Sequence, residues 1–362
     1  MPLEIMRCKI ILIHSCFLLF FNNLVNKQSR FSKETKMKIL HDKDANLRYL
    51  SGKTVAVIGY GSQGSAQALC MRDSGVNVII GSIKDASYDK AKKDGFEVMD
   101  VASAAKKADI IHILLPDEFH APVYEKDIKK HMKAGKVLCC SHGFNIVYKE
   151  IVPPADVDVI MVAPKSPATE ERKAFLEGFG VPGLVAVKQD ASGKALKIAL
   201  AMAKSMGFTR AGCLECTFEQ ETYEDLFGEQ NVLCGGLVDL MKYGFEVLIE
   251  AGYPPEMAYF ECVHEVKLIV DLVFEGGIQK MNAVISNTAE WGEYVNGPRI
   301  ITPDVKERMK ESLKDIESGK FAKVWLKEAR GGAKTLLAKR KELGKHPVEI
   351  VGKQIRELFE KK

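Results

Sequence analysis

The sequence predicts an α/β domain built on a parallel sheet, followed by an all-helical domain. Three observations carry this prediction. Six apolar segments of strand length alternate with helix-like segments between Lys53 and Ala211, a glycine-rich loop follows the first of them, and no strand-like segment follows Thr217. Near-continuous apolar strands separated by helices are typical of a parallel sheet that helices cover on both faces.

The expected elements follow in chain order. The six strands span 54–59, 76–81, 109–115, 136–141, 157–163 and 183–187. Thr217 and Gln220 have the spacing of a capping box, which predicts that the first long helix begins there. The change of pattern near Cys216 predicts a sheet domain at 37–216 and a helical domain at 217–362.

The composition excludes some classes of protein. The 362 residues are 46% hydrophobic and 28% charged, as in a globular protein with sizeable cores. A net charge of +4, without basic runs interleaved with aromatic residues, argues against nucleic acid as a partner. The one C-x-x-C pair, Cys213 and Cys216, has no second pair or histidine at zinc-like spacing. We therefore expect the nine cysteines to be structural thiols of a reducing compartment, the cytoplasm.

The first 36 residues continue neither pattern. An apolar run lies within 8–21, with Arg7 and Lys9 at its start, but no small-residue cleavage site follows it, and it is shorter than a membrane span. Three interpretations stay open: a signal peptide, an organellar presequence, or a start codon assigned upstream of Met37. We favour the third, and we expect residues 1–36 to be an extension outside the fold of a protein without a membrane partner.

The glycine-rich loop lies in VAVIGYGSQGSAQAL, where Gly59, Gly61 and Gly64 have G-x-G-x-x-G spacing directly after a strand and before a helix. Gly59 permits the tight turn, Gly61 lets the main chain approach a pyrophosphate, and Gly64 lets helix and strand pack closely. The helix N-terminus then faces the phosphate charge. This context predicts dinucleotide binding in a Rossmann-type domain.

The end of the second strand bears on the choice between NAD and NADP, because an NAD site usually has an acidic residue there for the ribose hydroxyls. Here the strand is followed by Ser82, Lys84 and Ser87, whose hydroxyls and ammonium suit a 2′-phosphate. Asp85 in the same turn favours the opposite choice. We expect NADP, with NAD as the alternative.

The segment YFECVHEVKLIVDLVFEGG at 259–277 reads as an apolar helix that nevertheless contains two glutamates one turn apart. The prolines at 254–255 suit a helix start and the glycines at 276–277 suit its end. A helix that is apolar almost all round is normally interior. Glu261 and Glu265 share one face of it, and two like charges in apolar surroundings cost several kcal/mol unless a cation compensates them.

A second acidic pair, Asp225 and Glu229, lies one turn apart at 221–236. Either pair alone would suit a solvated face, but two pairs on two apolar helices of one domain indicate a shared role. Mg²⁺ prefers carboxylate oxygens together with water and substrate. Four carboxylates around two Mg²⁺ would balance the charge and leave coordination positions open, so we expect a magnesium site.

With these residues assembled, the chain from Met37 to Lys362 resembles the short bacterial-type (class I) form of the ketol-acid reductoisomerase (acetohydroxyacid isomeroreductase) family. The resemblance rests on the motifs GYGSQG, SHGFNI, APKSP, DLFGEQ, YFECVHEVKLIVDL and ISNTAEWG. It implies an NADP-binding Rossmann domain joined to a knotted all-α domain. It also implies a homodimer with a shared active site, with larger assemblies left open.

The resemblance implies a small 2-hydroxy-3-keto acid as the substrate. With Mg²⁺ as a Lewis acid, an alkyl group of 2-acetolactate or 2-aceto-2-hydroxybutyrate migrates to the adjacent carbon, and hydride from NADPH reduces the new ketone. The product is a 2,3-dihydroxy acid of valine and isoleucine biosynthesis. Two other interpretations are a plain β-hydroxyacid dehydrogenase, which leaves the paired carboxylates unexplained, and a nucleotide-sensing module whose helices only dimerise.

Matched motif by motif, the resemblance implies roles for individual residues. The metal ligands would be Asp225, Glu229, Glu261 and Glu265, with the two pairs coming from different subunits. The substrate would contact Ser286 and Pro167, and the catalytic groups would be His142, Lys165 and Glu265. The cofactor would contact Gly59, Tyr60, Gly61, Ser62, Gln63, Gly64, Ser82, Lys84, Ser87, Pro116 and Gly143. His264, which points off the face of the glutamates, is interpreted as structural.

Three places depart from the family pattern. Ser65 follows the glycine loop where a histidine is usual. Ser166 and Ala168 occupy positions where glycines are common. The loop after Ile80 lacks the usual arginine and has Lys84 nearby, which weakens the expectation of NADP.

Overall fold

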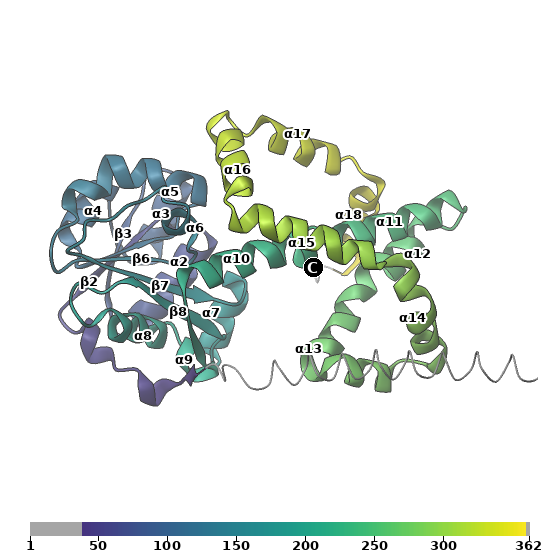
Figure 1. Cartoon of the computed structure of the whole chain (residues 1–362), viewed down its shortest axis with the longest axis horizontal. Coiled ribbons are helices and arrows are strands. Elements are labelled where there is room, and N and C mark those ends of the chain that lie inside the picture. Colours follow the sequence, from purple (N-terminus) through teal and green to yellow (C-terminus); the bar gives the residue numbers. More distant parts are fainter. Residues whose placement is uncertain (1–37, 360–362) are drawn as a thin grey trace, which may run out of the picture.

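The computed structural model describes residues 38–359, which form a sheet-containing part and a helical part (Figure 1). The extension predicted at 1–36 lies outside the described residues. Nine strands form one sheet in the order β1-β9-β8-β7-β6-β5-β2-β3-β4. The strands are β1 (Ile39–Leu40), β2 (Thr54–Ile58), β3 (Asn77–Gly81), β4 (Glu97–Met99), β5 (Ile110–Ile113), β6 (Val137–Cys140), β7 (Asp158–Pro164), β8 (Gly183–Gln189) and β9 (Cys213–Cys216).

All six predicted strands are present, as β2, β3, β5, β6, β7 and β8. The sequence does not predict β1, β4 and β9, which are two to four residues long. Segments this short show no periodicity that could be distinguished from a loop.

The predicted parallel sheet is confirmed for most of its strands, and only one edge departs from it. The six neighbouring strands β4, β3, β2, β5, β6 and β7 are parallel. At the other edge, β8 is antiparallel to β7, and β1 is antiparallel to β9. The reason is the connection through α7 (Ala168–Leu176). The chain leaves β7 at Pro164 and re-enters at Gly183, which is the residue paired with Pro164, so β8 must run back.

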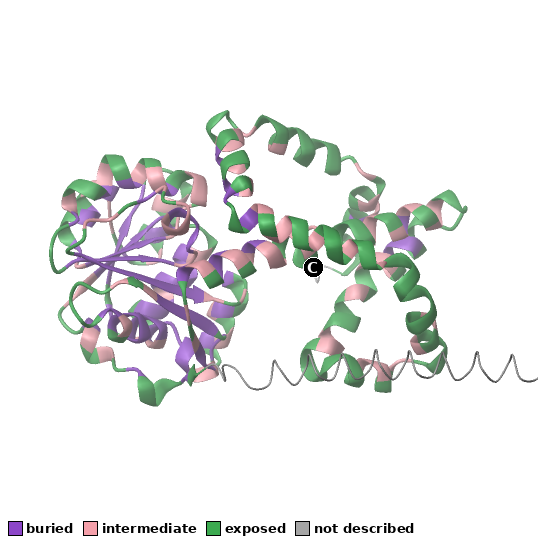
Figure 2. Ribbon diagram, in the orientation of Figure 1, coloured by how far each residue is buried: buried purple, intermediate pink, exposed green. Residues whose placement is uncertain are grey.

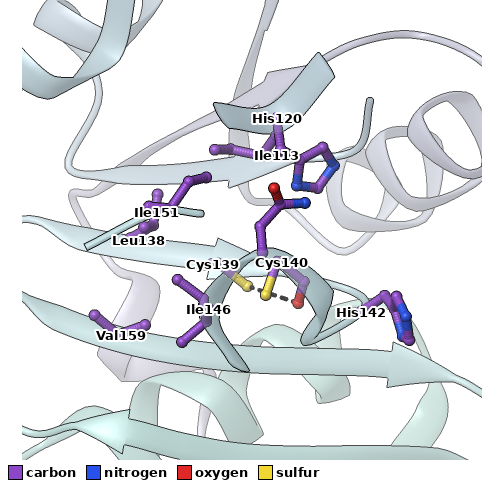
Figure 3. A pocket seen from close by; sticks show the side chains of 10 residues that line it. Ile113, His120, Leu138, Cys139, Cys140, His142, Ile146, Ile151 and Val159 are labelled. Carbon is purple, nitrogen blue, oxygen red and sulfur yellow. Dashed lines mark hydrogen bonds between the residues drawn. The ribbon is translucent and has the colours of Figure 1, made fainter. Parts of the chain in front are cut away.

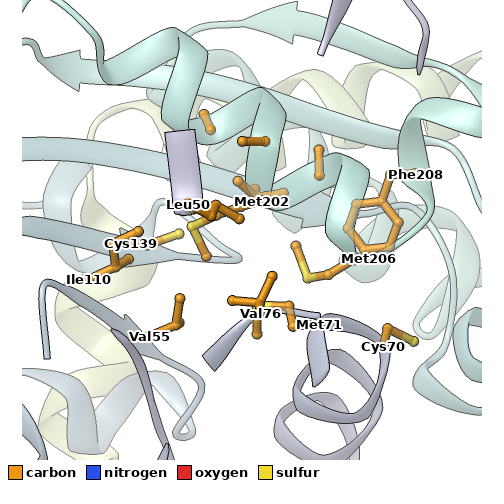
Figure 4. Packing of buried hydrophobic residues seen from close by; sticks show 14 of the residues in the cluster. Leu50, Val55, Cys70, Met71, Val76, Ile110, Cys139, Met202, Met206 and Phe208 are labelled. Atoms are coloured by element: carbon orange, nitrogen blue, oxygen red, sulfur yellow. The ribbon is translucent and has the colours of Figure 1, made fainter. Parts of the chain in front are cut away.

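Helices cover both faces of the sheet, and the main cores lie between sheet and helices. One core joins the sheet to α2 (Ser62–Asp73), α3 (Ala86–Lys93), α7 and α8 (Ala195–Ser205). Figure 4 shows part of it, with Met71, Met202 and Met206 filling the space beside Val55 and Ile110. The opposite core packs against α4 (Val101–Lys107). Buried residues are concentrated in this part of the molecule (Figure 2).

The helical part begins where the sequence predicts. Thr217 and Gln220 form a capping box with reciprocal hydrogen bonds of 3.0 and 2.9 Å. No strand follows β9 within the described residues, and none of their helices is long and apolar enough to cross a membrane. The helices are α10 (Phe218–Gly228), α11 (Gly236–Glu250), α12 (Pro255–Tyr259), α13 (Glu265–Val284), α14 (Asn287–Ile300), α15 (Pro303–Glu317), α16 (Lys320–Arg330), α17 (Lys334–Leu343) and α18 (Pro347–Phe359).

The helix expected at 259–277 is not interior in this chain, so that prediction is wrong. Of its apolar side chains only Tyr259 is buried, and several are exposed, with Leu268 at 54% and Phe274 at 89%. The prolines do begin it, and the chain bends at Gly277, whose φ of 79° is not helical. An apolar pattern predicts that a surface is covered but cannot predict whether the same chain covers it.

The cysteines agree in part with their expected structural role. Cys70, Cys139, Cys140 and Cys213 are buried, and burial raises the pKa of the Cys70 thiol to about 11. Cys234 is exposed at the end of a helical turn, so burial does not explain it.

Glu171 is an unusual buried acid in the sheet-containing part. It lies on α7, which packs against α2, and it is 0% exposed. Neither carboxylate oxygen has a hydrogen-bond partner among the described residues. Burial raises the pKa of Glu171 from 4.5 to about 8. Folding therefore takes up a proton between these two values, and the free energy of unfolding falls as pH rises through that window.

We expect Glu171→Gln to stabilise the protein at about pH 9 and to have little effect at about pH 5, because only the charged form is penalised. The pKa change is equivalent to at most about 5 kcal/mol at 1.36 kcal/mol per unit. Chemical denaturation of both proteins at the two pH values measures the difference. Glu170→Gln, one residue earlier and exposed, is the control. An equal effect of Glu171→Gln at both pH values would contradict the prediction.

Candidate active site

The glycine loop connects β2 to α2 with the geometry that a phosphate site needs. A Cβ on Gly64 would lie 2.2 Å from the carbonyl oxygen of Gly59, so only glycine fits there. A Cβ on Gly61 would meet nothing within 4 Å, which leaves the main chain open to a ligand. Gly61 is the N-cap of α2 without a side-chain cap, so the first N–H groups of the helix can bind a phosphate.

A groove of about 770 Å³ begins at this loop and crosses the carboxyl ends of the parallel strands. The loops after β2, β5, β6 and β7 form one side, and α10 with the turn after it forms the other. Ligands of open α/β sheets bind at this edge. Of the predicted site residues, the groove is lined by Gly61, Ser62, Gln63, Pro116, His142, Lys165, Pro167, Asp225 and Glu229.

Four charged side chains meet in the groove. Lys165 Nζ lies 2.9 Å from Asp225 Oδ1 and 3.7 Å from Glu221 Oε1. His142 Nδ1 lies 3.2 Å from Glu221 Oε1 and 3.5 Å from Asp225 Oδ2. The two cationic groups come from loops of the sheet, and the two carboxylates come from α10.

The carboxylates control the charge of His142 and Lys165. Burial lowers the pKa of His142, but the hydrogen bond and charge of Glu221, with Asp117 and Asp225, raise it to about 9. The pKa of Lys165 is also raised, because Asp225 and Glu221 outweigh its burial. Both groups are therefore protonated near neutral pH in the chain without metal.

Glu221 is a site residue that the sequence analysis missed. It is 1% exposed, and its second oxygen accepts the Gly143 N–H at 3.0 Å. The available signal was its position one helical turn before Asp225, which extends the acidic face by one residue. Gly143 thus contacts α10 rather than the groove, and a Cβ there would lie 2.3 Å from Thr222 Oγ1.

In each of the two acidic pairs predicted to bind metal, one residue lies in a π-helical turn. Glu229 begins the turn η5 (Glu229–Leu233), and Glu261 lies in η6 (Phe260–His264). Such turns are rare and are often found at functional sites. Burial, followed by the charge of Asp225, raises the pKa of Glu229, so its charged form is disfavoured at that end of the groove.

Glu261, Glu265 and Ser286 do not line the groove of the same chain. Both glutamates are exposed on the helical part. Ser286 is the N-cap of α14 and accepts the Ala289 N–H at 3.1 Å. His264 stacks on Phe359 with ring centroids 5.8 Å apart, in agreement with a structural role.

The loop after β3 leaves Lys84 free for a ligand. Lys84 is exposed, Ser87 is half-buried in the first turn of α3, and Ser82 is buried. Asp85, which favoured NAD in the sequence analysis, accepts the Tyr88 N–H at 3.0 Å and caps α3. Its carboxylate is therefore occupied in part by a structural bond.

The structure also places two predicted cofactor contacts, Tyr60 and Pro116, and Ser65, which stands where the family usually has a histidine. Tyr60 is buried, its hydroxyl donates to Asp94 at 2.8 Å, and it does not line the groove. Ser65 is also buried and donates to the Ser62 carbonyl at 3.1 Å. Pro116, at the groove, is the N-cap of α5 (Asp117–Val123).

A cavity of about 10 Å³ lies behind His142 (Figure 3). His142 is at its edge, away from the apolar side chains of Leu138 and Val159. His120, which also lines this cavity, donates from Nε2 to the Leu115 carbonyl at 2.7 Å, and this bond fixes the start of the loop after β5. This space holds at most one water molecule.

We expect Glu221→Gln to lower the pKa of His142 from about 9 by about 1–3 units, because it removes the adjacent negative charge. Histidine-ring NMR titration of the metal-free protein measures this change. Glu224→Gln, on an exposed position of the same helix, removes the same charge without either hydrogen bond and is the control. The same His142 titration in both variants would show that Glu221 does not hold the proton.

The comparisons with known proteins cover both parts of the chain. Residues 49–212 match the model of the acetohydroxy acid isomeroreductase NADPH-binding domain, and residues 218–361 match that of the ketol-acid reductoisomerase C-terminal domain. A ketol-acid reductoisomerase (NADP(+)) of Akkermansia muciniphila is 74% identical over 325 residues, which are 90% of this chain and all of the relative.

Two further matches come from an archaeal source. A ketol-acid reductoisomerase (NAD(+)) of an uncultured archaeon is 64% identical over 90% of this chain and all of the relative. A solved structure of an NADH-preferring ketol-acid reductoisomerase from an uncultured archaeon has a TM-score of 0.88 at 63% identity, and it covers 90% of this chain and all of its own.

Proposed function

Because the chain belongs to the ketol-acid reductoisomerase family, we propose that its groove is one half of an active site that two subunits complete. The chain is an enzyme of valine and isoleucine biosynthesis, and it converts 2-acetolactate or 2-aceto-2-hydroxybutyrate to the 2,3-dihydroxy acid. The dehydrogenase and the nucleotide-sensing module considered from the sequence are therefore set aside. The observation that carries the proposal is the joining of the glycine loop and the four charged groups in one groove.

The groove suits NADPH at one end and Mg²⁺ at the other. The open main chain at Gly61 and the uncapped start of α2 fit a pyrophosphate. Asp225 and Glu229, with Glu221 behind them, offer the oxygen ligands that Mg²⁺ prefers. When bound, Mg²⁺ would supply Lewis acidity for the alkyl migration and NADPH would supply the hydride.

The protein itself contributes two positively charged side chains, His142 and Lys165, at defined positions in the groove. Glu221 keeps a proton on His142 Nδ1 and, with Asp225, holds the Lys165 ammonium in the groove. Both groups therefore present positive charge where a ketone oxygen of the substrate becomes an alkoxide during reduction. The sheet loops and α10 also exclude water from one side of the bound substrate.

We propose that Glu261 and Glu265 come from the second subunit of a homodimer. In the single chain they lie on a surface with exposed apolar side chains, among them Leu268, Val270 and Phe274. Large exposed apolar patches mark interaction sites. A two-fold axis would bring Glu261 and Glu265 of each chain to the groove of the other chain. Ser286 would contact the substrate from the same side.

The remaining sequence predictions stay proposals. The end of β9 at Cys216 and the start of α10 at Phe218 support a domain boundary at 216. A knot in the helical domain, larger assemblies and a cytoplasmic location are expected from the resemblance or the sequence and await direct tests.

NADPH is the proposed cofactor, since Lys84 is exposed beside the expected 2′-phosphate position. We expect Lys84→Asp to weaken NADPH binding by about 1–3 kcal/mol, the range for a lost charged hydrogen bond, and to change NADH binding little. Titration calorimetry with each cofactor measures this. Lys93→Asp, at the far end of α3, controls for net charge. Equal losses for both cofactors would show that Lys84 does not bind the 2′-phosphate.

The shared site is tested with Asp225→Asn and Glu261→Gln. Each purified homodimer should lose turnover of 2-acetolactate, because each has two defective sites, while NADPH binding stays near that of the wild type. Asp239→Asn on α11 removes an exposed acid outside the groove and should stay active.

Co-expression of the two defective chains should restore activity. A mixed dimer collects both changes in one site and leaves the other intact, and random assembly makes about half of the dimers mixed. Activity should therefore recover to roughly a quarter of the wild type. Mixed dimers that form, as shown with two affinity tags, and stay inactive would refute a site shared between subunits.

A further inference from the structure

Two fully buried polar side chains lie beneath the groove. Gln67 on α2 and His112 on β5 are each 0% exposed, and neither lines the groove. His112 Nε2 lies 2.7 Å from Gln67 Oε1. Since an amide oxygen can only accept, His112 carries its proton on Nε2 and donates it to Gln67. Burial lowers the pKa of His112 to about 4, so the ring is neutral.

The amide nitrogen of Gln67 extends the bond into two branches. It donates to Gln63 Oε1 at 3.0 Å and to Ser141 Oγ at 3.1 Å. Ser141 in turn donates to the Val162 carbonyl at 2.8 Å, and Gln63 Nε2 donates to the Ser166 carbonyl at 3.4 Å. Both hydrogens of the Gln67 amide are used, so the network has one direction from His112 outwards.

The ends of these branches are the loops that carry the active-site groups. Gln63 belongs to the glycine loop, Ser141 directly precedes His142, and Ser166 directly follows Lys165. Gln67 therefore connects three loops that come from β2, β6 and β7. A buried network of this kind is rigid, because breaking one bond leaves a polar group without water.

We propose that Gln67 is a positioning residue, which sets His142 and Lys165 relative to the cofactor through hydrogen bonds to Ser141 and Gln63. The inference rests on the proposed roles of those two groups. Gln67 itself touches neither substrate nor cofactor. Its effect on the reaction is large because a displacement of about 1 Å at a reacting group can cost about 100-fold in rate.

The test compares Gln67→Leu with the double variant Gln67→Leu/His112→Leu. The single change leaves the His112 N–H and the Gln63 oxygen unpaired, so it lowers the melting temperature. The double change removes the unpaired histidine, and replacing both partners of a buried bond by apolar groups restores stability. It does not restore the bonds to Ser141 and Gln63.

We expect both variants to lose at least about tenfold in kcat per folded protein at saturating NADPH and Mg²⁺, with the melting temperature recovering only in the double variant. Thr209→Val is the control, because Thr209 is also 0% exposed but donates to Asp42, away from the groove. It should lose stability and keep its kcat. Gln67→Glu, which keeps the acceptor for His112 but loses both donors, replaces the single variant if that does not fold.

Two results would overturn the inference. One is a kcat that returns with stability in the double variant, and the other is a kcat of any folded Gln67 variant within about twofold of that of Thr209→Val. Wild-type turnover in the same assay separates the two hypotheses. Its absence would refute the proposed function, whereas the variants decide the role of Gln67 only when the wild type is active.

Discussion

One buried carboxylate, Glu221, joins the sheet-containing part to the helical part. It lies on the first helix after the sheet, is 1% exposed, and accepts from the Gly143 N–H and from His142. The approach is so close that position 143 has no room for a Cβ beside Thr222. A buried charge without partners is costly, so the docking of α10 and the placement of His142 stabilise each other. The position of Asp225, one turn along α10, follows from this contact.

The two parts of the chain differ in how completely they bury their apolar surface. The sheet has large cores on both faces, whereas the helical part has two small clusters. Its remaining apolar surface is exposed, as at Phe274 and Trp291. The same surface carries Glu261 and Glu265. In the proposed dimer, apolar burial and completion of the metal site are therefore one event, and neither is available to a single chain.

Local signals were sufficient for part of this structure. The glycine loop, the Thr217 capping box and six strands depend on residues close in sequence, and all are present. The direction of β8 depends on where α7 returns to the sheet, which no pattern within the strand contains. Glu221 looks like one more charge in an acidic, solvated stretch until the fold places it against Gly143. Apolar periodicity also cannot predict that the helix at 259–277 is exposed, because that depends on which chain covers it. Nor can it predict the π turn, which is a matter of backbone geometry.

The charges in the groove support the proposal that a second subunit completes the metal site. In the single chain, His142 and Lys165 balance Glu221 and Asp225, while Asp117 and Glu229 line the same groove. Burial, followed by the charge of Asp225, raises the pKa of Glu229, so its charged form is already disfavoured there. Two more glutamates from a partner would add negative charge, and the groove offers no further lysine, arginine or histidine near them except His120, whose pKa burial lowers. The added charge must then be compensated by cations from solution. Because carboxylates prefer hard divalent ions, assembly of the proposed dimer would raise the demand for Mg²⁺ above that of either acidic pair alone.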